Sequence, residues 1–275
     1  MAIINVSSDS FNGDGSDEEA SIRQRIEEAI TFGADILDVG GQSTRPGAQI
    51  ISEQEEIKRT VPAVKIARQM CDLPISIDTF KPQVAESAIK AGATIVNDIH
   101  GAEDHKMSKL VSSSGVDIVV MHSRGTPDSM MNLSSYPDGV VNEVSKYLIN
   151  RANDLVGNYG IEQSRIIIDP GIGFAKTPEQ SFELTNALEY FLSLGYRVLY
   201  GSSQKSFLGY ALSAQNGILA PLNQRKTATT ATTVFAILKE VNIVRVHDVR
   251  AAEEARRIVE CIKEPALINN RMIRG

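Results

Sequence analysis

The chain of 275 residues is 42% hydrophobic and carries a formal net charge of -6, so it can bury a substantial core, and single α/β barrels commonly run to roughly 250 residues. The charge includes no basic run, which argues against a nucleic-acid-binding or anionic-membrane surface. Cys71 and Cys261 have no zinc-type or C-x-x-C spacing, so a reducing compartment fits best, and the expected compartment is the cytoplasm. No apolar run approaches the roughly 18 residues of a membrane helix.

Eight short apolar runs recur along the chain, each followed by apolar residues at helical spacing. The predicted strands are 2–6, 36–39, 74–77, 94–96, 117–121, 166–168, 197–200 and 243–246, and the later predicted helices are about 105–114, 140–159, 178–194, 225–241 and 249–262. Each connection is long enough for a parallel crossover, and no hairpin signal separates two strands. The pattern predicts a single α/β domain, a (β/α)8 TIM barrel, over residues 1–275.

The sixth predicted strand leads into the stretch R-I-I-I-D-P-G-I-G-F-A-K-T, residues 165–177. Three isoleucines suit a strand buried on both faces, and Asp169 follows where the apolar run stops. Pro170 bars further pairing in a central strand, while Gly171 and Gly173 allow a tight turn or a close approach to a ligand. Asp169 is therefore predicted where parallel α/β folds bind ligands, with bracing of the turn as the alternative role.

Polar residues mark the ends of nearly all predicted strands, and in a barrel these ends gather at one mouth. They are Asn5, Asp38, Asp78, Asn97, Asp98, His122, Asp169, Lys205, Arg245 and His247. Acids and amides fall on strands three, four and six, and cations on strands seven and eight. This division favours a ligand with two chemically different ends.

The two groups suit different chemistry. Hydrogen bonds to the edge of a nitrogen heterocycle need acceptors and an amide, and these are offered by Asp78, Asn97 and Asp169. Arg245 and His247 lie two apart on a strand and share a face, so they are candidates to hold an anion, or with Asn5 an anion-bound metal.

Several other barrel chemistries are not predicted. The chain lacks the H-x-H of metal-dependent barrel hydrolases, a three-cysteine iron-sulfur motif, G-x-G-x-x-G and the P-loop. A Schiff base at Lys205, as in lysine-dependent aldolases, would need apolar surroundings that depress the lysine pKa. The run S-S-Q-K-S-F-L-G indicates a polar loop without such surroundings.

Eight sequence blocks carry a family resemblance. They are N-V-S-S-D-S-F, D-V-G-G-Q-S-T-R-P-G, S-I-D-T-F-K-P, V-N-D-I, V-M-H-S-R-G-T-P, D-P-G-I-G-F-A-K-T, S-Q-K-S-F-L-G and R-V-H-D-V. In order and spacing they resemble the dihydropteroate synthase family of pterin-binding TIM barrels, across essentially the whole chain. The chain departs from the family at Ser7-Ser8, where Thr-Pro is usual, and at Gln204, where an arginine is usual.

The resemblance implies a transferase of folate biosynthesis that joins 6-hydroxymethyl-7,8-dihydropterin pyrophosphate to p-aminobenzoate and releases pyrophosphate. The implied pterin-binding residues are Asp78, Asn97, Met121, Asp169, Phe174 and Lys205, and the implied pyrophosphate-binding residues are Asn5, Arg245 and His247. The implied p-aminobenzoate-binding residues are Phe11, Thr44, Arg45, Pro46 and Ser206. The implied catalytic residues are Asp78, Asp169, Lys205, Arg245 and His247, and Mg²⁺ is the implied cofactor, held by Asn5 with the pyrophosphate.

The resemblance also implies small-molecule substrates, no nucleic-acid or membrane partner, and a homodimer formed through the last helices. In some eukaryotes this barrel is the C-terminal part of a multifunctional folate protein. The chain is therefore expected to be either a cytoplasmic enzyme or a domain of such a longer protein, for which a mitochondrial location is an alternative.

Two other functions remain open from the sequence. A corrinoid-type pterin-dependent methyltransferase would use a similar barrel to bind methyltetrahydrofolate, but has no use for the S-T-R-P loop or the R-V-H block. A non-catalytic pterin-binding barrel is suggested by Gln204 and by the altered first loop. It would bind pterin without releasing pyrophosphate.

Overall fold

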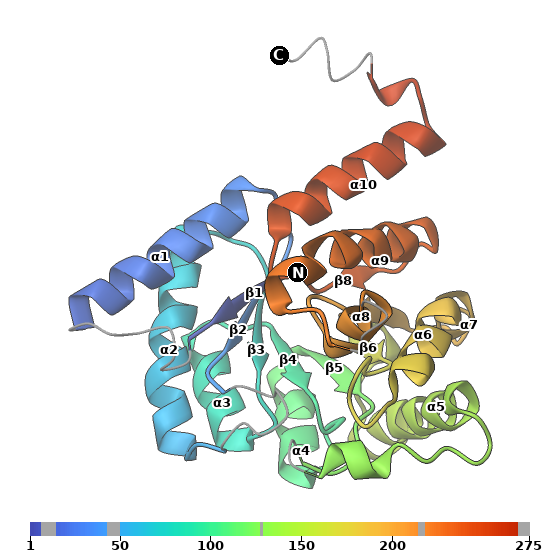
Figure 1. The fold of residues 1–275 in the computed structure, drawn as a ribbon. Coiled ribbons are helices and arrows are strands. Elements are labelled where there is room, and N and C mark those ends of the chain that lie inside the picture. The colour runs from blue at the N-terminus through green and yellow to red at the C-terminus, as the bar shows by residue number, and fades with distance from the viewer. Residues whose placement is uncertain (7–14, 43–49, 127–128, 214–217, 269–275) are drawn as a thin grey trace.

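The computed structural model describes residues 1–6, 15–42, 50–126, 129–213 and 218–268. In these ranges eight strands form one parallel sheet in the order β1-β2-β3-β4-β5-β6-β7-β8. The strands are β1 (Ala2–Asn5), β2 (Leu37–Gly40), β3 (Ile75–Asp78), β4 (Ile95–Asp98), β5 (Asp117–Met121), β6 (Ile166–Asp169), β7 (Arg197–Tyr200) and β8 (Ile243–Val244). Just after β8, Val246 pairs in parallel with Ala2, so the sheet closes on itself. The predicted (β/α)8 barrel is confirmed (Figure 1).

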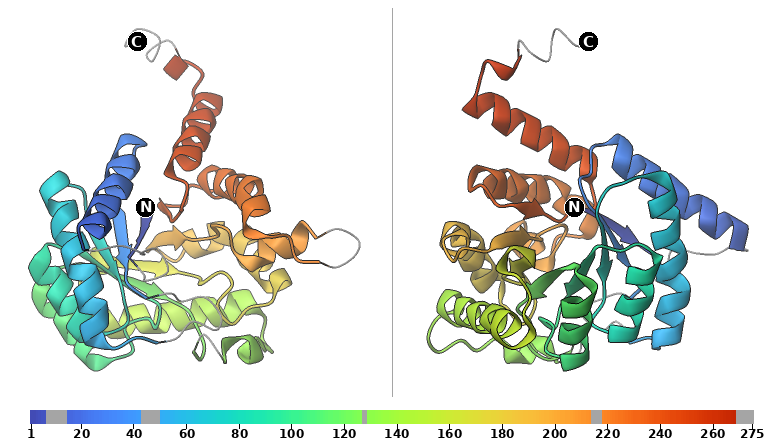
Figure 2. Two further views of the ribbon diagram at one scale, coloured as in Figure 1. Left: turned by 60° about the vertical axis from the view of Figure 1, so that its left-hand side comes forward. Right: turned by 180° about the vertical axis from the view of Figure 1, so that it is seen from behind.

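The helices lie outside the sheet and connect its strands (Figures 1 and 2). They are α1 (Gly15–Thr31), α2 (Glu53–Met70), α3 (Pro82–Ala91), α4 (His105–Ser114), α5 (Val140–Tyr159), α6 (Pro178–Asn186), α7 (Leu188–Leu192), α8 (Ser206–Ala211), α9 (Lys226–Leu238) and α10 (Val249–Lys263), with short 3-10 turns η2 (Met130–Leu133), η3 (Gln163–Arg165) and η4 (Leu222–Arg225). The start of α2 follows from its cap, since the Ser52 side chain accepts the N–H of Glu55 at 3.2 Å.

Two elements differ in kind from the sequence prediction, and the last strand, predicted over 243–246, ends at Val244. The helix predicted over 178–194 is divided into α6 and α7, with Ala187 between them. The polar run after β7, predicted as a loop, contains the short helix α8. Phe207 and Leu208 of α8 are buried, and the Phe207 ring packs against that of Phe182 with centroids 4.8 Å apart. This packing, which polar composition does not reveal, decides the conformation of the run.

The barrel interior has an apolar lower layer and a polar upper one. The lower layer is a separate hydrophobic cluster of Met1, Ile95, Val119, Ile167, Leu199 and Ile243. Because strand side chains alternate, the residues two positions further along point to the same interior. On β4, β5, β6 and the segment after β8 these are Asn97, Met121, Asp169 and Arg245. The apolar layer thus forms a floor beneath polar groups at the carboxyl ends of the strands.

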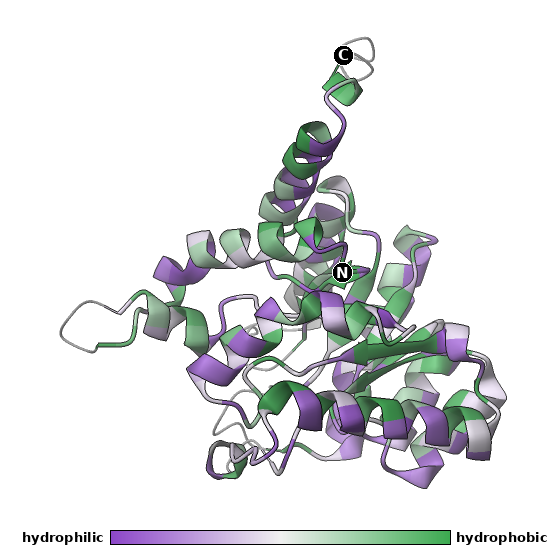
Figure 3. Cartoon of the chain, turned by 90° about the vertical axis from the view of Figure 1, so that its right-hand side faces the viewer, coloured by the Kyte–Doolittle hydropathy of each residue, from purple (hydrophilic) through white to green (hydrophobic). Residues whose placement is uncertain are grey.

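Helix α10 differs from the other helices because it extends away from the barrel (Figures 1 and 2). Figure 3 shows hydrophobic and hydrophilic segments alternating along it, while the strands at the centre are largely hydrophobic. Two of its isoleucines, Ile258 and Ile262, are 62% and 69% exposed. Among the described helices, none has the length and apolar character that crossing a bilayer requires.

Candidate active site

Three polar side chains predicted for a heterocycle lie at the carboxyl ends of adjacent or nearby strands. Asp78 ends β3, Asn97 lies near the end of β4 and Asp169 ends β6. The Asn97 and Asp169 residues are buried and the Asp78 side chain is 12% exposed. In the strand register Asp78 pairs with Asn97, and Met121 of β5 pairs with Asp169. The four residues therefore follow one another around the barrel mouth.

Arg245 joins two carboxylates across the mouth. Its Nε donates to Oδ2 of Asp38 at 2.6 Å, and its Nη2 donates to Oδ2 of Asp78 at 2.6 Å. The Asn97 amide donates to the same oxygen of Asp38 at 3.3 Å. Burial disfavours the guanidinium cation, but the two carboxylates outweigh burial and raise the Arg245 pKa. The arginine predicted for pyrophosphate is thus already paired with carboxylates in this structure.

The turn after β6 combines both roles that the sequence allowed for Asp169. Its Oδ1 accepts the N–H of Gly171 at 2.7 Å, so the carboxylate braces the turn as well as lying at the mouth. Gly171 has a φ of +68°, and a Cβ there would collide with the carbonyl oxygen of His122. Glycine is therefore required at this position, and it allows the turn to fold back over the end of β5.

Lys205 corrects one sequence expectation. Its Nζ donates to the carbonyl of Ile172 at 2.6 Å and lies 4.8 Å from the centroid of the Phe174 ring. Burial lowers the Lys205 pKa to about 8. The expectation that this lysine lacks pKa-lowering surroundings was wrong, because α8 and the turn after β6 enclose the run that was predicted to be a polar loop.

The other predicted residues lie nearer the surface or outside the described ranges. Asn5 ends β1 and is exposed, and its backbone carbonyl accepts a hydrogen bond from Arg25 at 2.5 Å. His247 is exposed, and its Nδ1 lies 2.9 Å from Oγ of Ser203. Ser206 is exposed at the first residue of α8. The predictions for Phe11, Thr44, Arg45 and Pro46 lie outside the described residues.

Comparisons with known proteins show the family to which the chain belongs. The chain matches the family model for pterin binding enzyme over residues 1–247. It is 41% identical to the dihydropteroate synthase of Clostridium beijerinckii over 265 residues, which cover 95% of this chain and 93% of that protein. The chain belongs to the dihydropteroate synthase family.

Solved structures of dihydropteroate synthases share its fold. The enzyme from Yersinia pestis, in complex with a sulfonamide drug, has a TM-score of 0.87 and 32% identity, with coverage of 96% of this chain and 93% of that one. The enzyme from Xanthomonas albilineans, with 4-aminobenzoic acid, has a TM-score of 0.86 and 32% identity, with coverage of 96% and 92%. Since its relatives are named as synthases, the chain is a transferase of folate synthesis and not a corrinoid-type methyltransferase.

Two buried charged residues near the barrel mouth were given no role from the sequence. Asp38 was noted as a strand-end acid but given no role, although it is fully buried and holds both Arg245 and Asn97. Lys176 is also buried, and its Nζ donates to the carbonyl of Phe174 at 2.9 Å and lies 3.0 Å from Nδ1 of His122. A charged residue within an apolar run was the available signal for Asp38, whereas nothing local marked Lys176 as buried.

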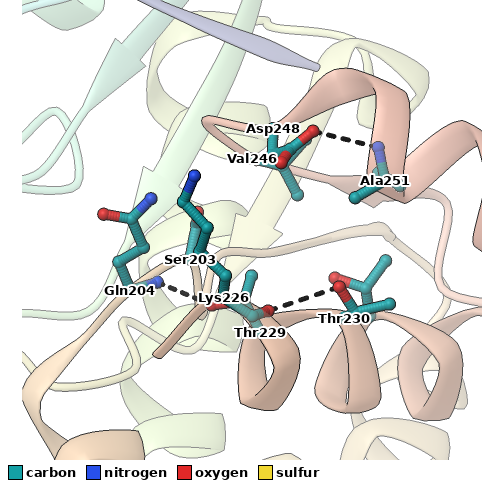
Figure 4. A pocket seen from close by; sticks show the side chains of 10 residues that line it. Ser203, Gln204, Lys226, Thr229, Thr230, Val246, Asp248 and Ala251 are labelled. Atoms are coloured by element: carbon teal, nitrogen blue, oxygen red, sulfur yellow. Dashed lines mark hydrogen bonds between the residues drawn. The ribbon is translucent and has the colours of Figure 1, made fainter. Parts of the chain in front are cut away.

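Gln204, where the synthase family usually has arginine, lies in the turn between β7 and α8. Its φ of +57° turns the backbone, and its N–H donates to Oγ1 of Thr229 at 3.0 Å. Gln204 is one of the residues that line a small hollow, open to solvent, between the β7–α8 turn, α9 and the start of α10 (Figure 4). This hollow contains Lys226 and Asp248 but none of the predicted substrate residues. The Oγ of Ser203, one of its lining residues, lies 2.9 Å from Nδ1 of His247, so the hollow borders that residue.

We expect pterin affinity to be greatest between about pH 7 and about pH 8. Burial raises the Asp78 pKa to about 7, against the opposing charge of Arg245, so this carboxylate takes up a proton and loses an acceptor below that pH. Burial lowers the Lys205 pKa to about 8, against the opposing charge of Asp169, so the ammonium is lost above it. Calorimetric titration with 6-hydroxymethylpterin from about pH 5 to about pH 10 measures both the acidic limb, where affinity rises with pH, and the basic limb, where affinity falls with pH.

Asp98 provides the control for the acidic limb. Burial raises its pKa to about 7 as well, but its carboxylate accepts the backbone N–H groups of His100 and Ala102 and not a group at the mouth. Asp98→Asn is therefore expected to leave the acidic limb in place. An affinity that stays constant across this pH range would show that neither Asp78 nor Lys205 controls pterin binding.

Proposed function

We propose that this synthase joins 6-hydroxymethyl-7,8-dihydropterin pyrophosphate to p-aminobenzoate and releases pyrophosphate. The proposal is supported chiefly by one connected group at the mouth, in which acids and an amide stand beside cations. Arg245 bonds to Asp78, and the charges of Asp169, Asp78 and Arg245 all act on the Lys205 amine. A ligand with a heterocycle at one end and a diphosphate at the other matches this division of charge.

In this reaction the bond between the pterin methylene carbon and the pyrophosphate oxygen breaks, and positive charge develops at the methylene. Asp78 and Asp169 stabilise the heterocycle by accepting its N–H groups and by their charge. Arg245, with His247 nearby, stabilises the negative charge that accumulates on the departing pyrophosphate. The aromatic amine then forms the new carbon–nitrogen bond and loses a proton. No strong base is required, because an aromatic amine is already nucleophilic.

We propose Mg²⁺ as a cofactor that binds together with the pyrophosphate. Within the described residues, no group of three or more His, Cys, Asp or Glu side chains could hold a metal ion by itself. Mg²⁺ commonly takes only one or two protein ligands beside substrate phosphates and water, and the amide oxygen of Asn5 is a suitable hard ligand at the end of β1. When bound, the ion would neutralise charge on the leaving pyrophosphate.

The function is tested by measuring pyrophosphate release. Release is expected only when the pterin pyrophosphate, p-aminobenzoate and Mg²⁺ are all present, and omission of any one provides the control. Chelation of the metal should stop release, and added Mg²⁺ should restore it. Tight pterin binding with no release under the complete conditions would instead identify a non-catalytic pterin-binding barrel.

We also propose that the chain forms a homodimer through α9 and α10. The exposed Ile258 and Ile262 are four residues apart and lie on one face of α10, and Leu238 at the end of α9 is 47% exposed. The helices α9 and α10 contact one another. Burial of such apolar side chains against a second copy would remove them from water.

Replacing Ile258 and Ile262 together by glutamate is expected to convert the dimer to a monomer. Charged side chains on both copies would have to be buried without partners, which opposes association. Light scattering after gel filtration should give the mass of two chains for the original protein and one for the variant. Arg257→Gln, which changes an exposed residue of the same helix, serves as the control. A monomeric original protein would contradict the proposal.

A further inference from the structure

Asp38 is entirely buried beneath the mouth, and one of its carboxylate oxygens carries two hydrogen bonds. Oδ2 accepts Arg245 Nε at 2.6 Å and Asn97 Nδ2 at 3.3 Å. Its other oxygen, Oδ1, is buried and has no hydrogen-bond partner among the described residues. A buried carboxylate oxygen without a donor is costly, so it marks a place where a donor belongs in another state of the site.

The guanidinium of Arg245, which is already bonded to Asp38, can supply such a donor. Nε and Nη2 form one edge of the guanidinium, and such an edge suits two parallel hydrogen bonds to a single carboxylate. In this structure the two atoms of that edge bond to different carboxylates. Nε donates to Asp38, and Nη2 donates to Oδ2 of Asp78. If Nη2 leaves Asp78, Oδ1 of Asp38 is the acceptor that completes a two-bond pair.

We propose that Asp38 is a positioning residue that keeps Arg245 in the site while the arginine changes partners. Nε stays on Asp38, and Nη2 moves from Asp78 to the second oxygen of Asp38 when the pterin engages Asp78. The exchange frees Asp78 for the N–H groups of the heterocycle. It also keeps the guanidinium at the mouth, where pyrophosphate is bound. This inference rests on the proposed function, because it assumes that Asp78 and Arg245 bind the two ends of one substrate.

Asp38 is suited to this role by its surroundings. It is fully buried on β2, between Ile3 of β1 and Ser76 of β3 in the strand register, so its backbone is held by both neighbouring strands. The Arg245 side chain is 22% exposed and Asp78 is 12% exposed, so a ligand can reach both. Asp38, the partner that Arg245 keeps, is therefore buried beneath the mouth. Asp78, the partner that Arg245 exchanges, is accessible to a ligand.

A double-mutant cycle tests the proposal through the affinity for inorganic pyrophosphate with Mg²⁺. The variants are Asp38→Asn, Arg245→Gln and the pair together. Asp38→Asn alone is expected to weaken binding roughly 10- to 100-fold, the usual loss when the partner that orients a binding side chain is removed. In the Arg245→Gln background it should cause no further loss, since the residue it positions is gone. Losses that multiply would show that Asp38 acts independently of Arg245 and would overturn the inference.

The same cycle separates this inference from the proposed function. If Arg245→Gln alone leaves pyrophosphate affinity unchanged, the proposed pyrophosphate site itself fails. Asp117→Asn is the matched control, because Asp117 is a strand aspartate that pairs with Arg197 at the opposite end of the barrel, at 2.7 Å. It should leave pyrophosphate affinity unchanged.

A second measurement is made on the original protein, and a variant serves only to assign one signal. The Nε–H signal of Arg245 in a nitrogen-15 NMR spectrum, assigned by its loss in Arg245→Gln, should be protected from exchange because it bonds to buried Asp38. It should remain protected when 6-hydroxymethylpterin is added. Loss of protection on pterin binding would show that Arg245 leaves Asp38 and would overturn the proposal.

Discussion

Replacing Asp169 by asparagine is expected to weaken the binding of 6-hydroxymethylpterin by roughly 100-fold or more, or about 3 kcal/mol. The buried carboxylate would be exchanged for a neutral amide that presents a donor where the heterocycle also presents donors. The change also removes a negative charge that raises the pKa of Lys205, so this amine would be less often charged at neutral pH. Calorimetric titration near pH 7.5, between the acidic and basic limbs of the affinity profile, measures the loss.

The structural cost of Asp169→Asn should be small, which makes the result interpretable. Asparagine retains an oxygen that can accept the N–H of Gly171, so the turn after β6 is expected to keep its shape. Asp117→Asn, at the opposite end of the barrel, should leave pterin affinity unchanged. If Asp169→Asn binds pterin as tightly as the original protein, Asp169 does not belong to the pterin site.

Arg245→Ala is expected to reduce pyrophosphate affinity by roughly 100-fold while reducing the affinity for bare pterin much less. It should also destabilise the fold by about 3–5 kcal/mol above pH 7, because Asp38 and Asp78 lose a shared cation and remain buried near one another. Titration with magnesium pyrophosphate and with 6-hydroxymethylpterin measures the two affinities. Unfolding in urea measures the stability.

Arg197→Ala is the matched control for this experiment. Arg197 begins β7 and pairs with Asp117 at 2.7 Å, far from the carboxyl ends of the strands. Its loss should change neither affinity. Equal losses of pyrophosphate and pterin affinity in Arg245→Ala would contradict the division of the pocket into two ends.

The arrangement of the barrel could be predicted from the sequence because it follows from local pattern. Short apolar runs, each ending in a polar residue, define strands buried on both faces, and parallel strands bring those ends to one mouth. Asp78, Asn97 and Asp169 were placed correctly at strand ends for this reason. The strand 117–121 was predicted with the bounds of β5.

The surroundings of these residues could not be predicted in the same way, because they depend on contacts between distant segments. The Lys205 run is polar in sequence, yet the packing of Phe207 forms α8 and burial lowers the lysine pKa. The partners of Arg245 are likewise invisible locally, since Asp38 and Asp78 are 207 and 167 residues away in the chain. Strand periodicity specifies which side chains face inward, but not which of them pair.

The seam where Val246 meets Ala2 also affects the order in which the pocket can assemble. The Met1 ammonium donates to the carbonyl of Val244 at 2.9 Å, across 243 residues of chain, and β8 itself has only two residues. Contacts between residues so far apart in the chain form slowly, so this seam is expected to close after the other strands have paired. Arg245 follows β8 directly, so its guanidinium would reach Asp38 and Asp78 only once this seam has closed.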